Sequence, residues 1–286
     1  MSSEPPWREY ERAVHEELRS KYPGVDVRFD VTIAGRRSRV DRQVDVLVLE
    51  QLHGTDVLTA VDAKHYGRRI DVTHVEAFLG LLDDISVDRG MMVSPNGYTP
   101  AALDRAFRDD VDLDLEILSL AELQVWQAEG AIPYAGRNAV LLPSPFGWII
   151  DGQRRSGMLA RLYRRGLPFE EAAEMREWMY VNLWDRTGAV DSLEALLAKQ
   201  SADIHESSPE AIIHVDDIQN DGGRRICIRT ADIPGYPATE ITGFAEFANS
   251  IFFAVLFTPP AVERRNRRKL EYLLRKVQPI HVRTAA

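Results

Sequence analysis

The sequence predicts an α/β fold of mixed α+β type, in which helices flank a central mixed sheet, followed by a second α+β domain. In the first 130 residues, segments with the 3.6-residue hydrophobic period of helices alternate with short runs typical of strands. Three prolines and three glycines then cluster between Gly130 and Gly147. Because such clusters often separate compact domains, we expect the domains to span residues 1–130 and 131–286.

The first domain is predicted to begin with a helix over residues 6–22, where Tyr10, Val14 and Leu18 share one face. Its further elements are a meander of strands Asp26–Ile33, Gln43–Glu50 and Asp56–His65, a helix at 72–85, a strand at Arg89–Ser94, a helix at Pro100–Phe107, a strand at Leu115–Leu118 and a helix from Leu120. This order is typical of a mixed sheet flanked by helices.

Two predicted helices begin with a capping-box pattern, Thr73-x-x-Glu76 and Ser119-x-x-Glu122. In this pattern the first side chain accepts a hydrogen bond from a backbone N–H of the first turn. Asp71 lies just before the first of these helices, and we interpret it as a capping group instead of a metal ligand.

The second domain has weaker patterns. The elements expected there are helices at Ser156–Arg165, Phe169–Asp185 and Asp191–Ala198, a hairpin of Ala211–Ile218 with Arg225–Thr230, a helix or strand at Phe244–Phe257 and a basic helix at Pro260–Val277. The turn sequence Asn-Asp-Gly-Gly favours the hairpin. In the second of these helices Trp178, Tyr180 and Trp184 are interpreted as a core face, with a base-stacking surface as the alternative.

Charge is unevenly distributed along the chain. The formal net charge is −9, which argues against a passive polyanion binder. Residues 1–133 hold 15 Lys and Arg against 25 Asp and Glu, whereas residues 134–286 hold 20 against 19. The final segment, Arg264–Ala286, has eight basic residues against Glu271 alone. Two interpretations stay open for it: a helix with a solvated basic face, or a nucleic-acid contact through Arg264, Arg265, Arg267 and Arg268.

Several classes of protein are disfavoured. The N-terminus is polar and acidic, unlike a secretory signal, and the apolar run Ile251–Phe257 is shorter than the roughly 20 residues that a membrane span needs. Cys227, the single cysteine, lies in an alternating run and is expected to be a small buried hydrophobe. We therefore expect a cytoplasmic protein without a membrane partner.

Three charged residues form the clearest candidate site. Asp62 and Lys64 point to the same side of a predicted strand because side chains alternate along strands. Asp45 lies on the preceding strand, so two carboxylates can converge on one hard cation such as Mg²⁺. Glu11, on the edge of the apolar stripe of the first helix, could join them; the alternative is a boundary residue facing solvent. A chance arrangement on the solvent face of a sheet is the alternative for the whole pattern.

This chemistry suits phosphodiester hydrolysis. A divalent cation withdraws charge from a phosphate and lowers the pKa of a bound water. A lysine beside it would orient the water or stabilise the transition state. Residues that could hold nucleic acid follow the strand: His65, Tyr66, Arg68 and Arg69. Arg36, Arg37, Arg39 and Arg42 in the first hairpin turn could do the same. A solvated turn is the alternative for both groups.

The sequence also resembles a known family. The segments RQVDVLV, VDAKHYGRRIDVTHVEAFLGLL and RGMMVSPNGYTPAAL are similar to the Mrr-like restriction endonucleases of the PD-(D/E)xK superfamily, over about residues 7–125. The resemblance implies that Asp45 and Asp62 are metal ligands, Lys64 the catalytic lysine and Glu11 the acid of the first helix. One departure is that residue 62 is Asp where many relatives have Glu or Gln.

Together these observations predict a metal-dependent DNA endonuclease in restriction or phage defence. Its cofactor would be Mg²⁺, with Mn²⁺ as a possible substitute, and its substrate double-stranded DNA. Cutting both strands requires two sites, so we expect a homodimer. The alternative is a catalytically silent nucleic-acid-binding module, or a subunit gated by a partner protein that docks on the C-terminal domain.

Overall fold

The computed structural model describes residues 4–52, 55–107, 114–127, 129–135, 138–186, 188, 190–218, 223–236 and 239–281. The chain divides into two compact units, Met1–Gln127 and Ala128–Ala286. In the described part of the chain, no helix combines the length and hydrophobicity that crossing a membrane requires.

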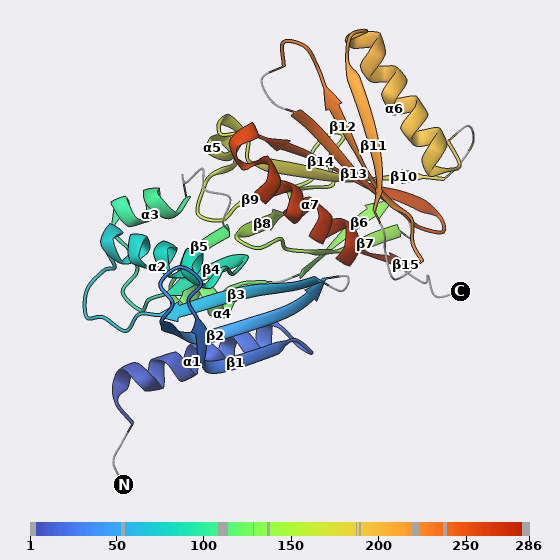
Figure 1. The fold of residues 1–286 in the computed structure, drawn as a ribbon. Coiled ribbons are helices and arrows are strands. Elements are labelled where there is room, and N and C mark those ends of the chain that lie inside the picture. The colour runs from blue at the N-terminus through green and yellow to red at the C-terminus, as the bar shows by residue number, and fades with distance from the viewer. Residues whose placement is uncertain are drawn as a thin grey trace, which may run out of the picture. The chain divides into compact units, whose positions relative to one another are not determined.

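The first unit is built on a five-stranded sheet in the order β1-β2-β3-β4-β5 (Figure 1). Its strands are β1 (Asp26–Ala34), β2 (Asp41–Leu52), β3 (Thr55–Ala63), β4 (Arg89–Val93) and β5 (Asp114–Leu118). The first three strands are antiparallel neighbours, and β3, β4 and β5 run parallel. The sheet is therefore mixed, as predicted, and the parallel half requires helical crossovers.

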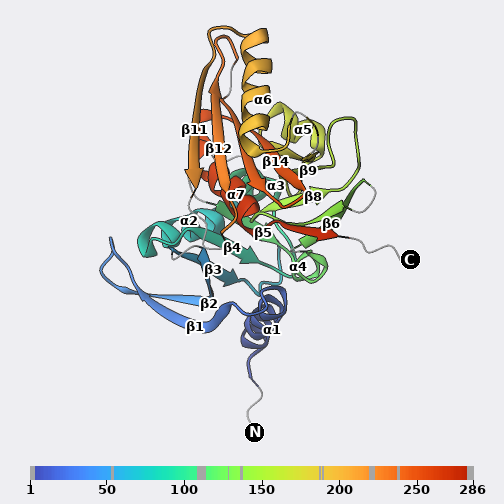
Figure 2. The same cartoon turned by 90° about the vertical axis from the view of Figure 1, so that its right-hand side faces the viewer.

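Four helices cover this sheet, α1 (Pro6–Lys21), α2 (Val72–Ile85), α3 (Pro100–Phe107) and α4 (Leu120–Val125). The two crossover helices α2 and α3 pack on one face, where Phe78 and Ala102 share a core with Ala60 and Met92. Figure 2 shows α1 and α4 on the opposite face. The predicted order of elements in this unit is confirmed.

The first turns of α2 and α4 can be compared with the two predicted capping boxes. Ser119 and Glu122 form the reciprocal capping box expected at α4. The helix at 72–85 is present as α2, but the prediction of Thr73 as its cap is wrong: the cap is Asp71, which accepts hydrogen bonds from the backbone N–H groups of Thr73 and His74. A carboxylate at this position also interacts favourably with the positive end of the helix dipole.

The second unit is built on two antiparallel sheets. The larger has the order β11-β12-β13-β14-β10-β9-β8 and the smaller the order β15-β7-β6. The strands are β6 (Glu129–Ala135), β7 (Asn138–Pro143), β8 (Trp148–Asp151), β9 (Ala160–Arg164), β10 (Trp178–Asp185), β11 (Ile212–Ile218), β12 (Ile226–Asp232), β13 (Thr239–Glu246), β14 (Ser250–Thr258) and β15 (Gln278–His281). Its helical elements are α5 (Phe169–Glu174), α6 (Leu193–Ser207), the short η1 (Pro260–Val262) and α7 (Glu263–Lys276).

Two cores lie on the two faces of the larger sheet. On one face, α7 and the smaller sheet contribute Leu270, Leu273 and Leu142 to a large apolar cluster. On the other face, α6 packs Leu193 and Leu196 against strands β12 to β14 and β10. Figure 1 shows α6 and α7 as the two long helices beside this sheet.

Several predictions for this unit are wrong. Residues 156–165 were expected to be helical but contain β9, and only the first part of 169–185 is helical, as α5, before β10 begins. The expected break at 130–147 contains β6 and β7. The apolar segment 244–257 contains the end of β13 and most of β14, so strand, one of its two interpretations, holds for most of it, with a break at 247–249.

Other predictions for this unit are confirmed. The hairpin of β11 and β12 is present, with Ile218 opposite Ile226, although residues 219–222 of its turn lie outside the described residues. The basic segment is helical, as α7. Cys227 is fully buried, and burial raises the pKa of its thiol to about 12, so it behaves as a small hydrophobe.

Candidate active site

Asp45 and Asp62 occupy neighbouring positions on β2 and β3. The two strands are paired as far as Val46 opposite Val61, and the two aspartates are the next residues on each strand. At this point the Asp45 carboxylate takes the place of a backbone acceptor: its Oδ2 accepts a 2.8 Å hydrogen bond from the backbone N–H of Ala63. The acid of one strand is thereby fixed against the segment of the other strand that carries Asp62 and Lys64.

Lys64 lies beside Asp62 at the end of β3. Its Nζ is 2.9 Å from Oδ1 of Asp62, and its side chain is 30% exposed. Its backbone N–H donates to the carbonyl of Val93 at 2.8 Å, which continues the parallel ladder beyond the last strand residue. Burial disfavours the charged ammonium, but the neighbouring carboxylates outweigh burial and raise the pKa of Lys64. The lysine is therefore a charged donor at neutral pH.

Among the acids of the site, Asp45 has a clearly shifted pKa. Burial is the largest cause that raises the pKa of its carboxyl to about 7; the negative charges of Asp62 and Glu11 act in the same direction, whereas the Ala63 hydrogen bond and Lys64 oppose it. Like charges on carboxyls that share a site favour protonation of one of them. The four residues predicted as the catalytic set are thus close enough to influence one another.

Glu11 approaches from α1 and is buried. Its carboxylate accepts a 3.0 Å hydrogen bond from Arg8, and the same guanidinium also contacts Asp30 of β1. Arg8 was absent from the predicted site, although its spacing three residues before Glu11 is the signal for such a helical pair. It connects the acid of the first helix to the sheet.

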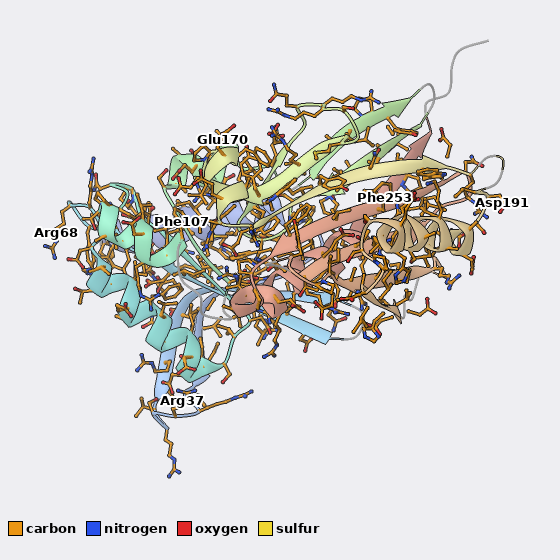
Figure 3. All side chains as sticks on the ribbon, turned by 90° about the horizontal axis from the view of Figure 1, so that it is seen from above. Arg37, Arg68, Phe107, Glu170, Asp191 and Phe253 are labelled. Atoms are coloured by element: carbon orange, nitrogen blue, oxygen red, sulfur yellow. The ribbon has the colours of Figure 1, made fainter. Side chains whose placement is uncertain are left out.

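The segment after β3 is exposed, as expected for residues that contact a ligand in solution. The His65 ring lies 5.3 Å from the ring of buried Tyr10, and the Tyr66 ring packs edge-on against His74 at 5.2 Å. Figure 3 shows Arg68 at the edge of the fold, pointing away from it. Arg69 is exposed as well. These four residues follow Lys64 in the segment that leaves the end of β3.

The donor chemistry of the site fits a hard divalent cation. Asp45 and Asp62 offer carboxylate oxygens from adjacent strands, and the pKa of Asp45 is raised first by burial and then by the negative charges of Asp62 and Glu11. Within the described residues there is no group of three His, Cys, Asp or Glu side chains arranged to hold a metal. Two carboxylates are nevertheless a usual protein contribution for Mg²⁺, which keeps several waters and takes further oxygens from phosphate.

The arginines of the basic helix α7 are less available to a ligand than its sequence suggested. Arg265 is only 3% exposed, and its guanidinium contacts Glu177. Arg267 pairs with Asp216 at 3.2 Å, while Arg264 is exposed. Arg268 is half-buried. The interpretation of a common nucleic-acid contact is therefore wrong for Arg265, because a buried and paired guanidinium is not available to phosphate.

A cavity of about 540 Å³ lies within the second unit. Its lining includes Tyr134, Arg154, Asn182, Trp184 and Asp185. None of the predicted catalytic residues contributes to it. We place the candidate site by its charged groups instead, because catalytic groups of nucleases must remain open to a bulky polymer.

A mixed sheet with two acids and a lysine at the end of two adjacent strands defines the class of PD-(D/E)xK nuclease folds. Residues 3–126, most of the first unit, match the restriction endonuclease family of the Mrr type, and this match supports nuclease activity on DNA. No curated protein matches the chain.

Among solved structures, the chain is similar to the PsbP protein CyanoP of Synechocystis sp. PCC 6803. The two share 12% identity over 54% of this chain and 94% of that one, with a TM-score of 0.37.

Proposed function

We propose that the protein is a metal-dependent DNA endonuclease of restriction or phage defence, with Asp45, Asp62, Lys64 and Glu11 as its catalytic residues. The observation that supports this most is the hydrogen bond between Asp45 and the backbone of Ala63, because it fixes both acids and the lysine in one place. The match of residues 3–126 to restriction endonucleases supports the same reaction.

Each residue has a distinct part in the proposed mechanism. Asp45 and Asp62 would hold Mg²⁺, or Mn²⁺ in its place, and this ion would polarise the scissile phosphate and lower the pKa of a water. Lys64 presents its ammonium next to Asp62 and would stabilise the charge that develops on the phosphate oxygens. Glu11, held by Arg8, would keep the negative potential that attracts the cation.

Cleavage of supercoiled plasmid tests the proposal. The purified protein is incubated with Mg²⁺, with Mn²⁺ and with EDTA, beside Asp62→Ala and Lys64→Ala. We expect metal-dependent nicking or linearisation by the wild type, and a loss of at least about 100-fold in both variants, comparable to losing a key electrostatic group. Arg19→Ala, a change at an exposed site on α1, is the matched control and should cleave like the wild type.

The alternative is a silent module or a subunit gated by a partner protein that docks on residues 131–286. Binding of DNA without cleavage, on methylated and unmethylated plasmid alike, would support it and contradict the proposal. A homodimer that cuts both strands is part of the proposal. A monomeric mass in solution, with and without DNA, would contradict that part alone.

A further inference from the structure

The turn between β1 and β2 concentrates positive charge in a unit that is otherwise acidic. Positions 36 to 42 comprise most of the turn and the first two residues of β2, and four of these seven residues are arginines, Arg36, Arg37, Arg39 and Arg42. The first three are exposed, and Figure 3 shows Arg37 at the tip of the turn, pointing away from the fold. We call residues 36–42 the arginine turn. Its charge contrasts with the excess of ten acidic over basic residues in positions 1–133, 25 against 15.

The arginine turn is held in one conformation by a buried acid. Asp84 of α2 is 6% exposed, and its carboxylate accepts hydrogen bonds from the backbone N–H groups of Arg37 and Ser38, at 3.0 and 2.8 Å. It also accepts one from the Ser38 hydroxyl at 2.6 Å. The backbone carbonyl of Asp84 accepts from the N–H of Arg36 at 2.7 Å. These bonds hold the pKa of Asp84 below its ordinary value.

The backbone of the arginine turn is also constrained by its own sequence. Arg39 adopts φ +59°, in the left-handed region that residues other than glycine rarely enter. A side chain at Gly35 would overlap Ser38 and Asp84, so the turn closes tightly over that position. Strained backbone persists only where the surroundings over-determine it, and it is concentrated at functional sites.

The four arginines differ in whether their side chains form ion pairs. Arg37 pairs with Asp83 at 2.6 Å, and Arg42 lies 3.6 Å from Asp84. Arg36 and Arg39 have no ion-pair partner among the residues that the structure describes. A rigid turn that presents unpaired guanidinium groups has no evident role in stability, because exposed arginines contribute little to it.

We propose that the arginine turn binds the phosphate backbone of the DNA, with Arg36 and Arg39 as the principal contacts. This inference rests on the proposed function, because it takes DNA as the substrate. The turn leads directly into β2, and Asp45 lies four residues from the first residue of that strand, which is about 13 Å at the rise of a strand. Phosphate contacts made by the turn, which precedes this strand, would set the register of the duplex on the site without reading its sequence.

Salt-dependent binding tests the proposal. Affinity for a labelled duplex oligonucleotide is measured by fluorescence anisotropy in EDTA, from about 50 to 200 mM salt, in a Lys64→Ala background that cannot cleave. We expect Arg36→Gln with Arg39→Gln to weaken binding about tenfold and to reduce the salt slope by about 1.8, since each lost phosphate contact removes about 0.9. The matched control is Arg19→Gln with Arg105→Gln, which changes the net charge equally elsewhere in the unit.

A second variant distinguishes two explanations of DNA binding: contacts from a rigid turn, and attraction by net charge alone. Asp84→Ala removes a negative charge, so attraction by net charge alone predicts tighter DNA binding. The proposal predicts the opposite, a loss of about fivefold or more, because the guanidinium groups would no longer be held in place. Ser38→Ala keeps the charge and removes one of the bonds, and it should give a smaller loss in the same direction. Thermal unfolding confirms that each variant is folded.

The outcomes distinguish this inference from the proposed function. If the wild type cleaves DNA but the double arginine variant binds with an unchanged salt slope, only the arginine turn proposal is wrong. If the slope falls as expected and the wild type never cleaves, the turn is supported and the nuclease proposal fails. If the wild type does not bind DNA at all, or Asp84→Ala binds more tightly, the proposal for the turn is overturned.

Discussion

Oδ2 of Asp45 accepts a 2.8 Å hydrogen bond from the backbone N–H of Ala63, the residue between Asp62 and Lys64. The acid on β2 is therefore positioned by the strand that carries the other two groups, and not by a loop. Groups held by strands are placed more reproducibly than groups on loops, which suits chemistry that requires a fixed geometry. The contact between Lys64 and Asp62 completes the arrangement.

That contact predicts that metal binding and cleavage can be separated by mutation. The Lys64 ammonium neutralises an oxygen of Asp62, so Lys64→Ala should bind Mn²⁺ at least as tightly as the wild type although it does not cleave. Asp62→Ala should weaken Mn²⁺ binding by about tenfold or more, since it removes a carboxylate ligand. Isothermal titration calorimetry on the full chain measures both affinities.

The control for this pair is Lys64→Arg, which keeps the charge next to Asp62. It should leave Mn²⁺ affinity close to that of the wild type. The prediction is wrong if Lys64→Ala binds Mn²⁺ much more weakly than Asp62→Ala. The lysine would then hold the two acids in place, and its ammonium would not compete with the cation for their oxygens.

Asp45 predicts a pH dependence of stability in the absence of metal. Its carboxyl has a pKa of about 7 in the folded protein, against about 3.9 in an unfolded chain. Between these values the folded state binds more protons, so stability is highest below pH 4 with respect to this group and falls as the pH rises to 7. Asp45→Asn should therefore stabilise the metal-free protein by roughly 2–4 kcal/mol at pH 8 and by nearly nothing at pH 4.

Urea unfolding in EDTA at the two pH values measures this effect. Asp56→Asn, at a site on β3 that is exposed, serves as a control for the loss of a carboxylate. An equal gain at both pH values would show that the amide fits the site better for reasons other than charge.

Much of the first unit is predictable from its sequence. Its helices have one apolar face, as in α1 with Val14 and Leu18, and β1 alternates between exposed and half-buried positions. The hydrophobic period therefore identifies the helices and β1, whereas β4 and β5 are buried throughout and are recognised only as short apolar runs. The pairing of Asp45 with Ala63 was not predictable, because it depends on β2 and β3 separating at one particular residue.

The second unit is less predictable for a physical reason. Strands β9 and β14 are buried along nearly their whole length, so neither shows the period of two that marks a strand with one solvent face. In β10 the aromatic residues Trp178, Tyr180 and Trp184 share one face of a strand, yet Tyr180 and Trp184, four residues apart, would also share one face of a helix. Short apolar runs of this kind leave helix and strand unresolved in sequence alone.

Burial of Arg265 leads to the last prediction. In sequence it is one of several equivalent basic residues of α7, but its guanidinium is buried and contacts Glu177, which also accepts a 3.0 Å hydrogen bond from Asn266. Removing one partner of a buried pair leaves an uncompensated charge, so Arg265→Ala should destabilise the protein by about 3–5 kcal/mol. Arg264→Ala, at an exposed position of the same helix, should change stability by less than about 0.5 kcal/mol.

Urea unfolding of the two variants measures this difference, and Glu177→Gln in combination with Arg265→Met tests its cause. Because the double variant removes both charges, it should recover part of the stability that Arg265→Ala loses. DNA affinity tests the alternative interpretation. If Arg265→Ala unfolds at the same urea concentration as the wild type but binds DNA with a reduced salt slope, Arg265 contacts phosphate and the prediction is wrong. Weaker DNA binding that follows the fraction of unfolded protein would instead place Arg265 in the core of the second unit.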